Sequence, residues 1–520
     1  MVGAKQLGAL AFVLTVAPAL RGALAGTPES WVPVRWQGGP LEVARRTKDK
    51  TLPADPSARD AIAQWYDPAT LGLLEGTPLN CLLVTWSAGE DAGAEKQQQD
   101  LVKAYTRLAH ERGVAVLGLV YPGADPSKFV GPAVEAGLDG LVLEGEFSGG
   151  AAFVEQVEKA LGAANSKALV LPIAREAASA RTSKRPIVAV SGIRPSARNL
   201  ADMGIRSGPS AEPWIDSNIW LVRSFRFGAA WRPVWISQEP KAASLNDYIR
   251  CVAEAAVAGG RWMVALDDKF RAMLLRKDAD SLATWRGVAS YLKFAEDHAA
   301  WRGFAPYGNL GIILDTASAY PDISNEYLNL VARRQVPYRL VPRSEFSAAS
   351  LEGFQAVLAA DLAPPTDAER RLLRAFAEKG GLVVAGPWWG DPPKDKPYAE
   401  VPFGKGRVAV YKDDPPDPES VARDMQDLLS PDEMGVSAFN VPSVLTYASS
   451  SDSGKRMLVQ LLNYSRFPAE AVTIRVNGSF KTARLFTPEA APSELAVKRV
   501  GSRTEIAIRE LAVWGGVLLE

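Results

Sequence analysis

The sequence predicts a multidomain α/β protein, in which a (β/α)8 TIM barrel is followed by a doubly wound α/β domain and a small C-terminal antiparallel β-sandwich. Three observations predict this fold class. The chain has 520 residues, which is too long for one ordinary domain. Short apolar runs alternate with amphipathic helical patterns over more than half of the chain, as in α/β folds. Near the C-terminus the pattern changes to alternating strands separated by Gly, Pro, Ser and Asn.

Residues 1–25 are typical of a secretion signal. Lys5 supplies positive charge, Leu7 to Leu20 form the apolar segment, and Ala23-Leu24-Ala25 is a small-x-small cleavage site. The alternative is a membrane anchor, but the apolar run of about 14 residues is short for a bilayer span. We therefore expect a secreted or periplasmic protein with no membrane association after removal of the signal.

Eight apolar runs are expected to form the barrel strands, because strands of a parallel sheet are buried on both faces. They are CLLVTW (81–86), VAVLGLVY (114–121), GLVLEGE (140–146), KALVLPI (167–173), PIVAVSG (186–192), NIWLVRSF (218–225), PVWIS (233–237) and RWMVALDD (261–268). Amphipathic patterns lie between them, such as Glu95 to Arg112 with Gly113 as its stop. In an alternative register VPVRW (32–36) is the first strand, which shifts the numbering of the strands by one.

A second α/β unit begins near Asn309. Its expected strands are NLGIILD (309–315), PYRLV (337–341), FQAVLAA (354–360) and LVVAG (382–386). A helix over 366–381 begins with a capping box formed by Thr366 and Glu369. The sequence TASAYPD after Asp315 is not a glycine-rich phosphate loop, so we expect no nucleotide cofactor.

The last part of the chain predicts the β-sandwich. Its expected strands are RMLVQLLNYS (456–465), AVTIRV (471–476), TARLFT (482–487), TEIAIRE (504–510) and AVWGGVLLE (512–520).

Charge and composition exclude several classes of function. Lys plus Arg and Asp plus Glu both number 59, so no excess of basic residues favours nucleic acid or an anionic membrane surface. The only histidines are His110 and His298, and the only cysteines are Cys81 and Cys251, expected as buried residues rather than a disulfide. A Ser-His-Asp triad and a His/Cys zinc site are thereby nearly excluded, and no metal is expected. Carboxylates must carry any hydrolytic chemistry.

The order of the three parts resembles the family-42 β-galactosidases, which have a barrel, a trimerisation domain with a glutamine-amidotransferase-like fold, and a small C-terminal β domain. The most specific stretch is 232–268, where a PVWI strand ending in polar residues precedes a helix with AEAAVAGG and then a strand. It resembles the seventh and eighth strands of that family, where a P-x-W-V-x-E strand ends in the nucleophile. Residues 309–386, including FAEKGGLVVAG, resemble the trimerisation domain.

This resemblance implies domains at 26–305, 306–432 and 433–520, and a homo-oligomer, specifically a trimer. The chain departs from the family at the catalytic positions. Aligning PVWISQ on the seventh strand puts Gln238 at the position of the nucleophile and Glu239 one residue later. Because side chains alternate along a strand, Glu239 then points differently unless a bulge or turn restores its direction.

The Asn-Glu pair that ends the fourth strand in that family is also absent. In the first register the fourth strand is followed by Ala174-Arg175-Glu176. In the alternative register DGLVLEGEF (139–147) is the fourth strand, with Glu144 or Glu146 as the acid.

Glycoside hydrolysis needs two carboxyl groups, and barrel enzymes place such groups at the carboxyl ends of the strands. The candidate catalytic residues are Glu239, Glu146, Glu144 and Asp267. The candidate substrate-binding residues are Trp86, Tyr121, Gln238, Asp268 and Trp214. Each has a structural alternative, because acids at strand ends also cap helices or pair with arginines, and Trp86 can pack beneath the rim.

The sequence thus predicts an exported glycoside hydrolase that acts on O-glycosyl bonds, with galactosides as the substrate implied by the resemblance. The alternative is a catalytically inactive glycan-binding protein on the same scaffold, which Gln238 favours. The two hypotheses differ in whether two carboxyl groups face each other across one cleft.

Overall fold

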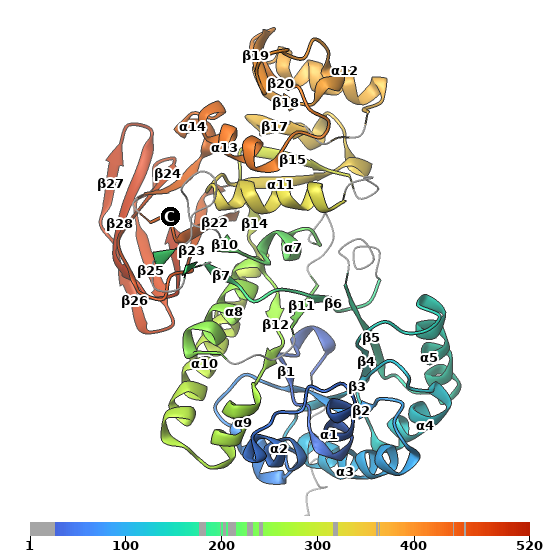
Figure 1. Ribbon diagram of the computed structural model, residues 1–520. Helices are drawn as coiled ribbons and strands as arrows, with labels where there is room; N and C mark the ends of the chain where they lie inside the picture. The colour runs from blue at the N-terminus through green and yellow to red at the C-terminus, as the bar shows by residue number, and fades with distance from the viewer. Residues whose placement is uncertain are drawn as a thin grey trace, which may run out of the picture.

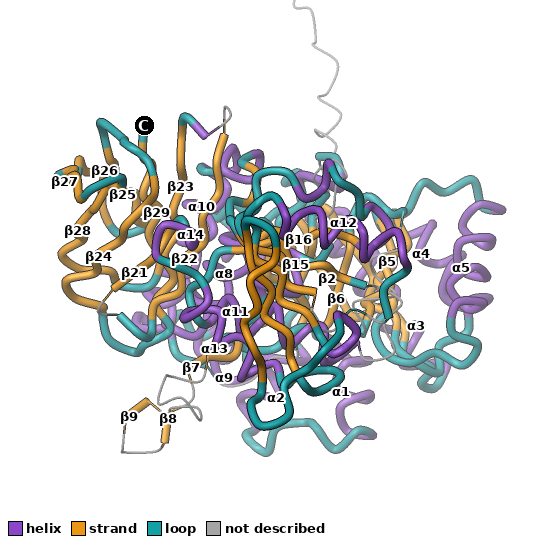
Figure 2. Tube along the Cα trace, turned by 90° about the horizontal axis from the view of Figure 1, so that it is seen from above, coloured by secondary structure: helices purple, strands orange, loops and turns teal. Residues whose placement is uncertain are grey.

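The computed structural model describes residues 26–175, 184–197, 199–200, 204–205, 215–225, 232–238, 243–315, 321–359, 362, 364–439, 441–451 and 454–520. The expected signal at residues 1–25 lies outside them. The described chain forms a barrel with its helices, an α/β domain above it and a β-sandwich at one side (Figure 1). Seen from above, the strands of the sandwich and the barrel helix α5 lie at opposite sides (Figure 2).

The barrel is a closed parallel sheet. Its strands are β1 (Pro33–Arg35), β2 (Cys81–Ser87), β3 (Ala115–Val120), β4 (Gly140–Leu143), β5 (Leu169–Ala174), β6 (Val188–Ser191), β11 (Val234–Ser237), β12 (Arg261–Trp262) and β13 (Val264–Ala265). The last barrel strand is divided at Met263: β12 pairs with β11, and β13 pairs with β1. These pairings close the cylinder and confirm the predicted (β/α)8 barrel.

The register is the alternative one, with β1 as the first strand. The expected strand at 218–225 is wrong, because these residues form helix α7 (Ile219–Arg223). A short, continuous apolar run does not distinguish a buried strand from a buried helix by its period. The correction makes β4 the fourth barrel strand and β11 the seventh.

Helices cover the outside of the barrel. They are α1 (Gly39–Lys48), α2 (Pro56–Ala63), α3 (Ala92–His110), α4 (Pro126–Ala136), α5 (Ala151–Ala163), α8 (Leu245–Ala258), α9 (Asp268–Leu275) and α10 (Ala279–Asp297). Alternate residues of each strand pack outward against these helices or inward in the barrel. On β11, for example, Ile236 belongs to the outer core and Trp235 to the inner core.

The α/β domain has a six-stranded sheet in the order β16-β15-β17-β18-β20-β19. Strands β15 (Leu310–Leu314), β16 (Tyr338–Pro342), β17 (Ala356–Ala359), β18 (Leu382–Ala385) and β20 (Gly406–Tyr411) are parallel, and β19 (Tyr398–Phe403) is antiparallel. Helices α11 (Pro321–Arg333) and α13 (Pro418–Leu428) pack on one face and α12 (Asp367–Glu378) on the other. The capping box of Thr366 and Glu369 is present at the start of α12.

Two antiparallel sheets form the C-terminal sandwich and enclose one apolar core. The first contains β14 (Ala305–Pro306), β22 (Val444–Ser451), β23 (Arg456–Asn463), β29 (Trp514–Leu519), β25 (Ala483–Thr487) and β26 (Ala490–Glu494). The second contains β21 (Val436–Phe439), β24 (Ala469–Asn477), β28 (Arg503–Leu511) and β27 (Val497–Val500). None of the helices in the described ranges has the length and apolarity needed to cross a membrane.

Candidate active site at the barrel mouth

Arg35 organises the polar residues at the mouth of the barrel. It is the last residue of β1, and its guanidinium group is buried inside the barrel. It binds both carboxylate oxygens of Glu144: Nη1 lies 2.7 Å from Oε1, and Nη2 lies 2.8 Å from Oε2. Glu144 directly follows β4, and its side chain remains 16% exposed. This bidentate geometry is the one that arginine makes with an ionised carboxylate.

The same guanidinium group reaches the end of the seventh strand. Its Nη1 donates a hydrogen bond of 2.6 Å to Oγ of Ser237, the last residue of β11. Its Nε donates to Oε1 of Gln37 at 3.1 Å. The ends of the first, fourth and seventh strands therefore meet around one side chain.

Tyr121 extends this network to the end of the third strand. Its hydroxyl accepts a 2.6 Å hydrogen bond from Nε2 of Gln37, and the guanidinium of Arg45 lies 4.1 Å from the centre of its ring. Burial raises the pKa of Tyr121 well above its ordinary value, so its hydroxyl stays neutral. Arg45 also binds Glu42, whose carboxylate accepts from Oγ1 of Thr85 at 2.9 Å. The mouth thus combines hydroxyl, amide and charged groups.

The structure brings Glu144 and Tyr121 together but places Glu146 elsewhere. The side chain of Glu146 is 79% exposed and forms an ion pair with Arg175. Gly145 separates the two glutamates and has a φ of 111°, which favours glycine. Glu146 therefore lies outside the network of Arg35.

Two aspartates that follow the eighth strand have structural contacts. Asp267 caps α9, with Oδ1 accepting from the backbone N–H of Phe270 at 3.0 Å and Oδ2 accepting from the hydroxyl of Tyr248 at 2.8 Å. Asp268 binds Arg46 through both oxygens and Arg271 at 2.7 Å. Burial disfavours the charged form of Asp268, but the bonds to these arginines outweigh burial and lower its pKa. Asp267 thus caps a helix and Asp268 pairs with arginines, which are the structural alternatives to a role in catalysis or substrate binding.

Trp86 does not suit the sugar platform that we expected. It is completely buried, belongs to the core between the barrel and its helices, and donates a 3.1 Å hydrogen bond from Nε1 to the carbonyl of Phe129. The residue points outward because it alternates with Thr85 and Ser87 along β2. No face of its ring is open to a ligand.

Side chains alternate in direction along β11, and Gln238 points out of the barrel. Trp235 and Ser237 point into the barrel, whereas Gln238 lines a small cavity against α8 with Tyr248 and Cys251. Glu239 and Trp214 lie outside the described residues.

The residues that hold this site together, above all Arg35, Gln37 and Ser237, were not among those expected from the sequence. The signal was an arginine inside the apolar run VPVRW, at a position that the alternative register places in the first barrel strand. A charged residue in such a strand is rarely buried without a partner. Across the described ranges, no group of three or more His, Cys, Asp or Glu side chains could hold a metal ion.

No protein-family model matches the chain, and no curated protein matches it by sequence. Solved structures do match. α-L-Fucosidase isoenzyme 2 from Paenibacillus thiaminolyticus superposes with a TM-score of 0.58 at 12% identity, covering 87% of this chain and 96% of that chain. Gan42B, a GH42 β-galactosidase from G. stearothermophilus, gives 0.44 at 10% identity, with 94% and 98% covered. A rhamnosidase from Novosphingobium sp. PP1Y gives 0.40 at 14% identity, with 82% and 39% covered.

The likeness to the fucosidase extends over nearly the whole of both chains. At this low identity it shows a shared fold. The resemblance of the sequence to a divergent glycoside hydrolase with a TIM barrel is therefore confirmed at the level of fold: the chain has the architecture of such an enzyme.

Proposed function

We propose that the protein is a glycoside hydrolase that uses Glu144 and Glu239 as its carboxylate pair. One observation carries this proposal: Nη1 of Arg35 contacts both Glu144, after the fourth strand, and Ser237, at the end of the seventh. The ends of these two strands therefore meet at the guanidinium group of Arg35. Barrel enzymes can carry a pair of facing carboxylates on such strand ends. The fucosidase that shares the fold is named for the same class of chemistry.

The contacts of Glu144 suggest its role. A carboxylate held by both prongs of an arginine is ionised, which suits a nucleophile or a base and not a general acid. Along β11, Trp235 and Ser237 point into the barrel, whereas Gln238 lines a cavity against α8. Glu239 is the first acid that follows this strand in the sequence, which supports it as the second carboxyl group, with the role of acid.

The leaving group of the substrate separates the two roles. A general acid is needed for a sugar leaving group but hardly for an activated aryl group such as dinitrophenolate. We expect Glu239→Gln to lose oligosaccharide hydrolysis while it retains the release of dinitrophenolate. Glu144→Gln is expected to lose both activities. Equal losses of both activities in the two variants would contradict the assignment of roles.

A second candidate function is glycan binding without catalysis. Two observations favour it: Arg35 occupies both oxygens of Glu144, and the inward residue at the end of β11 is a serine. This function predicts saccharide binding without turnover on any aryl glycoside or oligosaccharide. The residues of the mouth would then act through hydrogen bonds to sugar hydroxyls.

The proposal extends to substrate, location and assembly. Galactosides are the first substrates to test, given the family-42 resemblance. The N-terminal sequence pattern supports export to the periplasm or the medium, and the resemblance of residues 309–386 to a trimerisation domain supports a homotrimer. Light scattering on the mature protein tests the trimer, since a monomeric mass would contradict it.

A further inference from the structure

A cleft outside the barrel mouth lies between helix α7 and strand β16, at an edge of the sheet in the α/β domain. Its volume is about 320 Å³, which is within the size range of small-ligand sites. Apolar side chains form much of its wall, including Leu340, Pro342 and Phe354. Two arginines, Arg223 and Arg339, come from different domains to line it.

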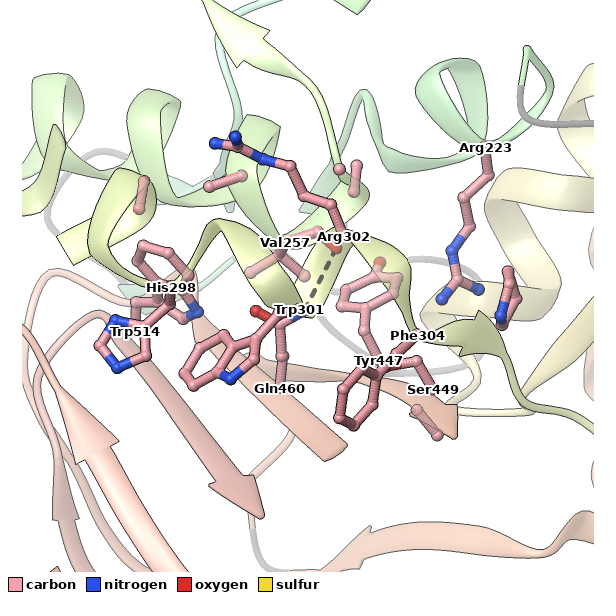
Figure 3. Close-up of a pocket in the computed structure, with 16 residues that line it drawn as sticks. Arg223, Val257, His298, Trp301, Arg302, Phe304, Tyr447, Ser449, Gln460 and Trp514 are labelled. Atoms are coloured by element: carbon pink, nitrogen blue, oxygen red, sulfur yellow. Dashed lines mark hydrogen bonds between the residues drawn. The ribbon is translucent and has the colours of Figure 1, made fainter. Parts of the chain in front are cut away.

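Arg223 is the last residue of α7 and reaches out from the barrel. Its guanidinium lies 4.9 Å from the centre of the Tyr447 ring, and no hydrogen bond or ion pair joins it to any residue in the described ranges. Figure 3 shows this side chain directed from its helix toward Tyr447, at the edge of a neighbouring cavity of about 30 Å³. Arg223 lines both cavities, and among the described residues no carboxylate pairs with its charge there.

The surroundings of Arg223 supply hydrogen-bond donors. The hydroxyl of Tyr338, which lines the cleft, is buried and has no hydrogen-bond partner in the described part of the chain. The nearby carboxylate of Glu254 is already bound by Asn218 and Tyr464. The polar end of the cleft therefore presents the Arg223 cation together with a tyrosine hydroxyl that can donate to an anion.

Arg339 provides a second cation on β16. Its Nε donates to the carbonyl of Gly308 at 2.9 Å, and its guanidinium stacks 3.9 Å from the centre of the Phe354 ring. Burial lowers its pKa, and no carboxylate forms an ion pair with it in the part of the chain that the structure describes. Among the residues that line the cleft, only Glu345 carries a negative charge, and it is exposed.

We propose that this cleft binds a small organic anion with an apolar body, such as an aromatic carboxylate. The carboxylate pairs with Arg223 and Arg339, and the body lies against Pro342 and Phe354. The two guanidinium groups have no carboxylate partner among the described residues, so they favour a ligand with a negative charge. The apolar wall disfavours a sugar acid, because its hydroxyls would lose their hydrogen bonds to water there. This site is separate from the barrel mouth and does not depend on the proposed hydrolase function.

Calorimetric titration of the full chain with cinnamate tests the proposal, with uncharged cinnamamide as the matched ligand. Cinnamate should bind at least about tenfold more tightly than cinnamamide, because only the acid can pair with the arginines. Arg223→Met and Arg339→Met should each weaken cinnamate at least about tenfold. Arg286→Met, which removes an exposed charge on α10, should leave the affinity unchanged.

Two controls keep the test decisive if a methionine variant fails to fold. Arg339→Lys retains the charge and should still bind cinnamate more tightly than cinnamamide, and the affinity of the wild type for cinnamate should fall as salt is added. The Glu144→Gln variant should bind cinnamate as the wild type does, because Glu144 lies in the barrel mouth. Equal affinity for cinnamate and cinnamamide would overturn the proposal, as would no effect of either arginine variant. Glucuronate that binds as tightly as cinnamate would overturn the assignment of an apolar body.

Discussion

Polarity and position along the strand together decide which residues of the barrel mouth contact the network of Arg35. Glu144 and Tyr121 follow apolar strands directly, and both join the network of Arg35. Glu146 and Asp267 have the same chemistry, but the turn at Gly145 and the helix cap of α9 direct them to other contacts. These contacts depend on local backbone angles, which residue type alone does not specify. Trp86 does not form the expected sugar-binding surface, because its side chain points to the core between the strands and the helices. The neighbouring residues of the strand point into the barrel.

The His110–Asp139 pair predicts a pH dependence at the scale of one residue. Nε2 of His110 lies 2.9 Å from Oδ2 of Asp139, and this bond raises the pKa of His110 above 6.5. Its contribution to stability is therefore fully present below about pH 6.5 and is lost as the pH rises through the raised value. Urea unfolding across this range should show that loss in the wild type and a flatter profile in His110→Gln. Parallel profiles in the two proteins would contradict this role.

At the scale of elements, the sequence located most strands but not the register of the barrel. The three-residue strand β1 was visible only as an alternative, and the apolar run at 218–225 is the helix α7. The barrel still has the expected eight strands, because β1 is added and the expected strand at 218–225 is removed. A short apolar segment contains too few residues for its hydrophobic period to distinguish a strand from a buried helix. What settles the register is pairing between distant residues, such as Val34 with Val264.

Two glycines test the packing of elements against each other. A Cβ on Gly118 of β3 would come within 2.8 Å of the Trp86 Cβ and 2.9 Å of the Leu138 Cδ1, so Gly118→Ala should destabilise the protein by about 1–3 kcal/mol. Gly162 in α5 has no atom within 4 Å of such a position. Gly162→Ala should therefore stabilise by about 0.5 kcal/mol through helix propensity. Thermal unfolding measures both, and a Gly118→Ala protein as stable as the wild type would contradict the tight contact.

At the scale of the whole molecule, three parts were predictable from the change in sequence pattern, but the contacts between them were not. Strand β14 leaves the barrel and pairs with β22, which follows the whole α/β domain in the chain. Glu254 of the barrel helix α8 accepts a 2.7 Å hydrogen bond from the hydroxyl of Tyr464, which follows β23 of the sandwich. Such contacts join residues far apart in the chain and leave no local periodic signal.

The buried contact between barrel and sandwich predicts coupling of the two parts. Burial raises the pKa of Glu254, and the hydroxyl of Tyr464 is one of its few hydrogen-bond donors. Tyr464→Phe removes this hydroxyl, which also contacts Oγ of Ser217 at 3.3 Å, and should cost about 1.5–3 kcal/mol in the free energy of unfolding. Chemical denaturation measures the loss, with Tyr291→Phe as comparison, because the hydroxyl of Tyr291 in α10 donates to Glu489 of the sandwich. An unchanged stability would mean that this bond does not hold the parts together.

Hydrolysis by the mature protein and two glutamine variants decides whether Glu144 is catalytic. The wild type, Glu144→Gln and Glu146→Gln would be compared on one panel of aryl glycosides and oligosaccharides. Glu146, exposed and outside the network of Arg35, is the matched control. We expect turnover by the wild type, a loss of at least about 100-fold in Glu144→Gln and no loss in Glu146→Gln. Turnover that survives in Glu144→Gln would contradict a catalytic mouth built on Glu144.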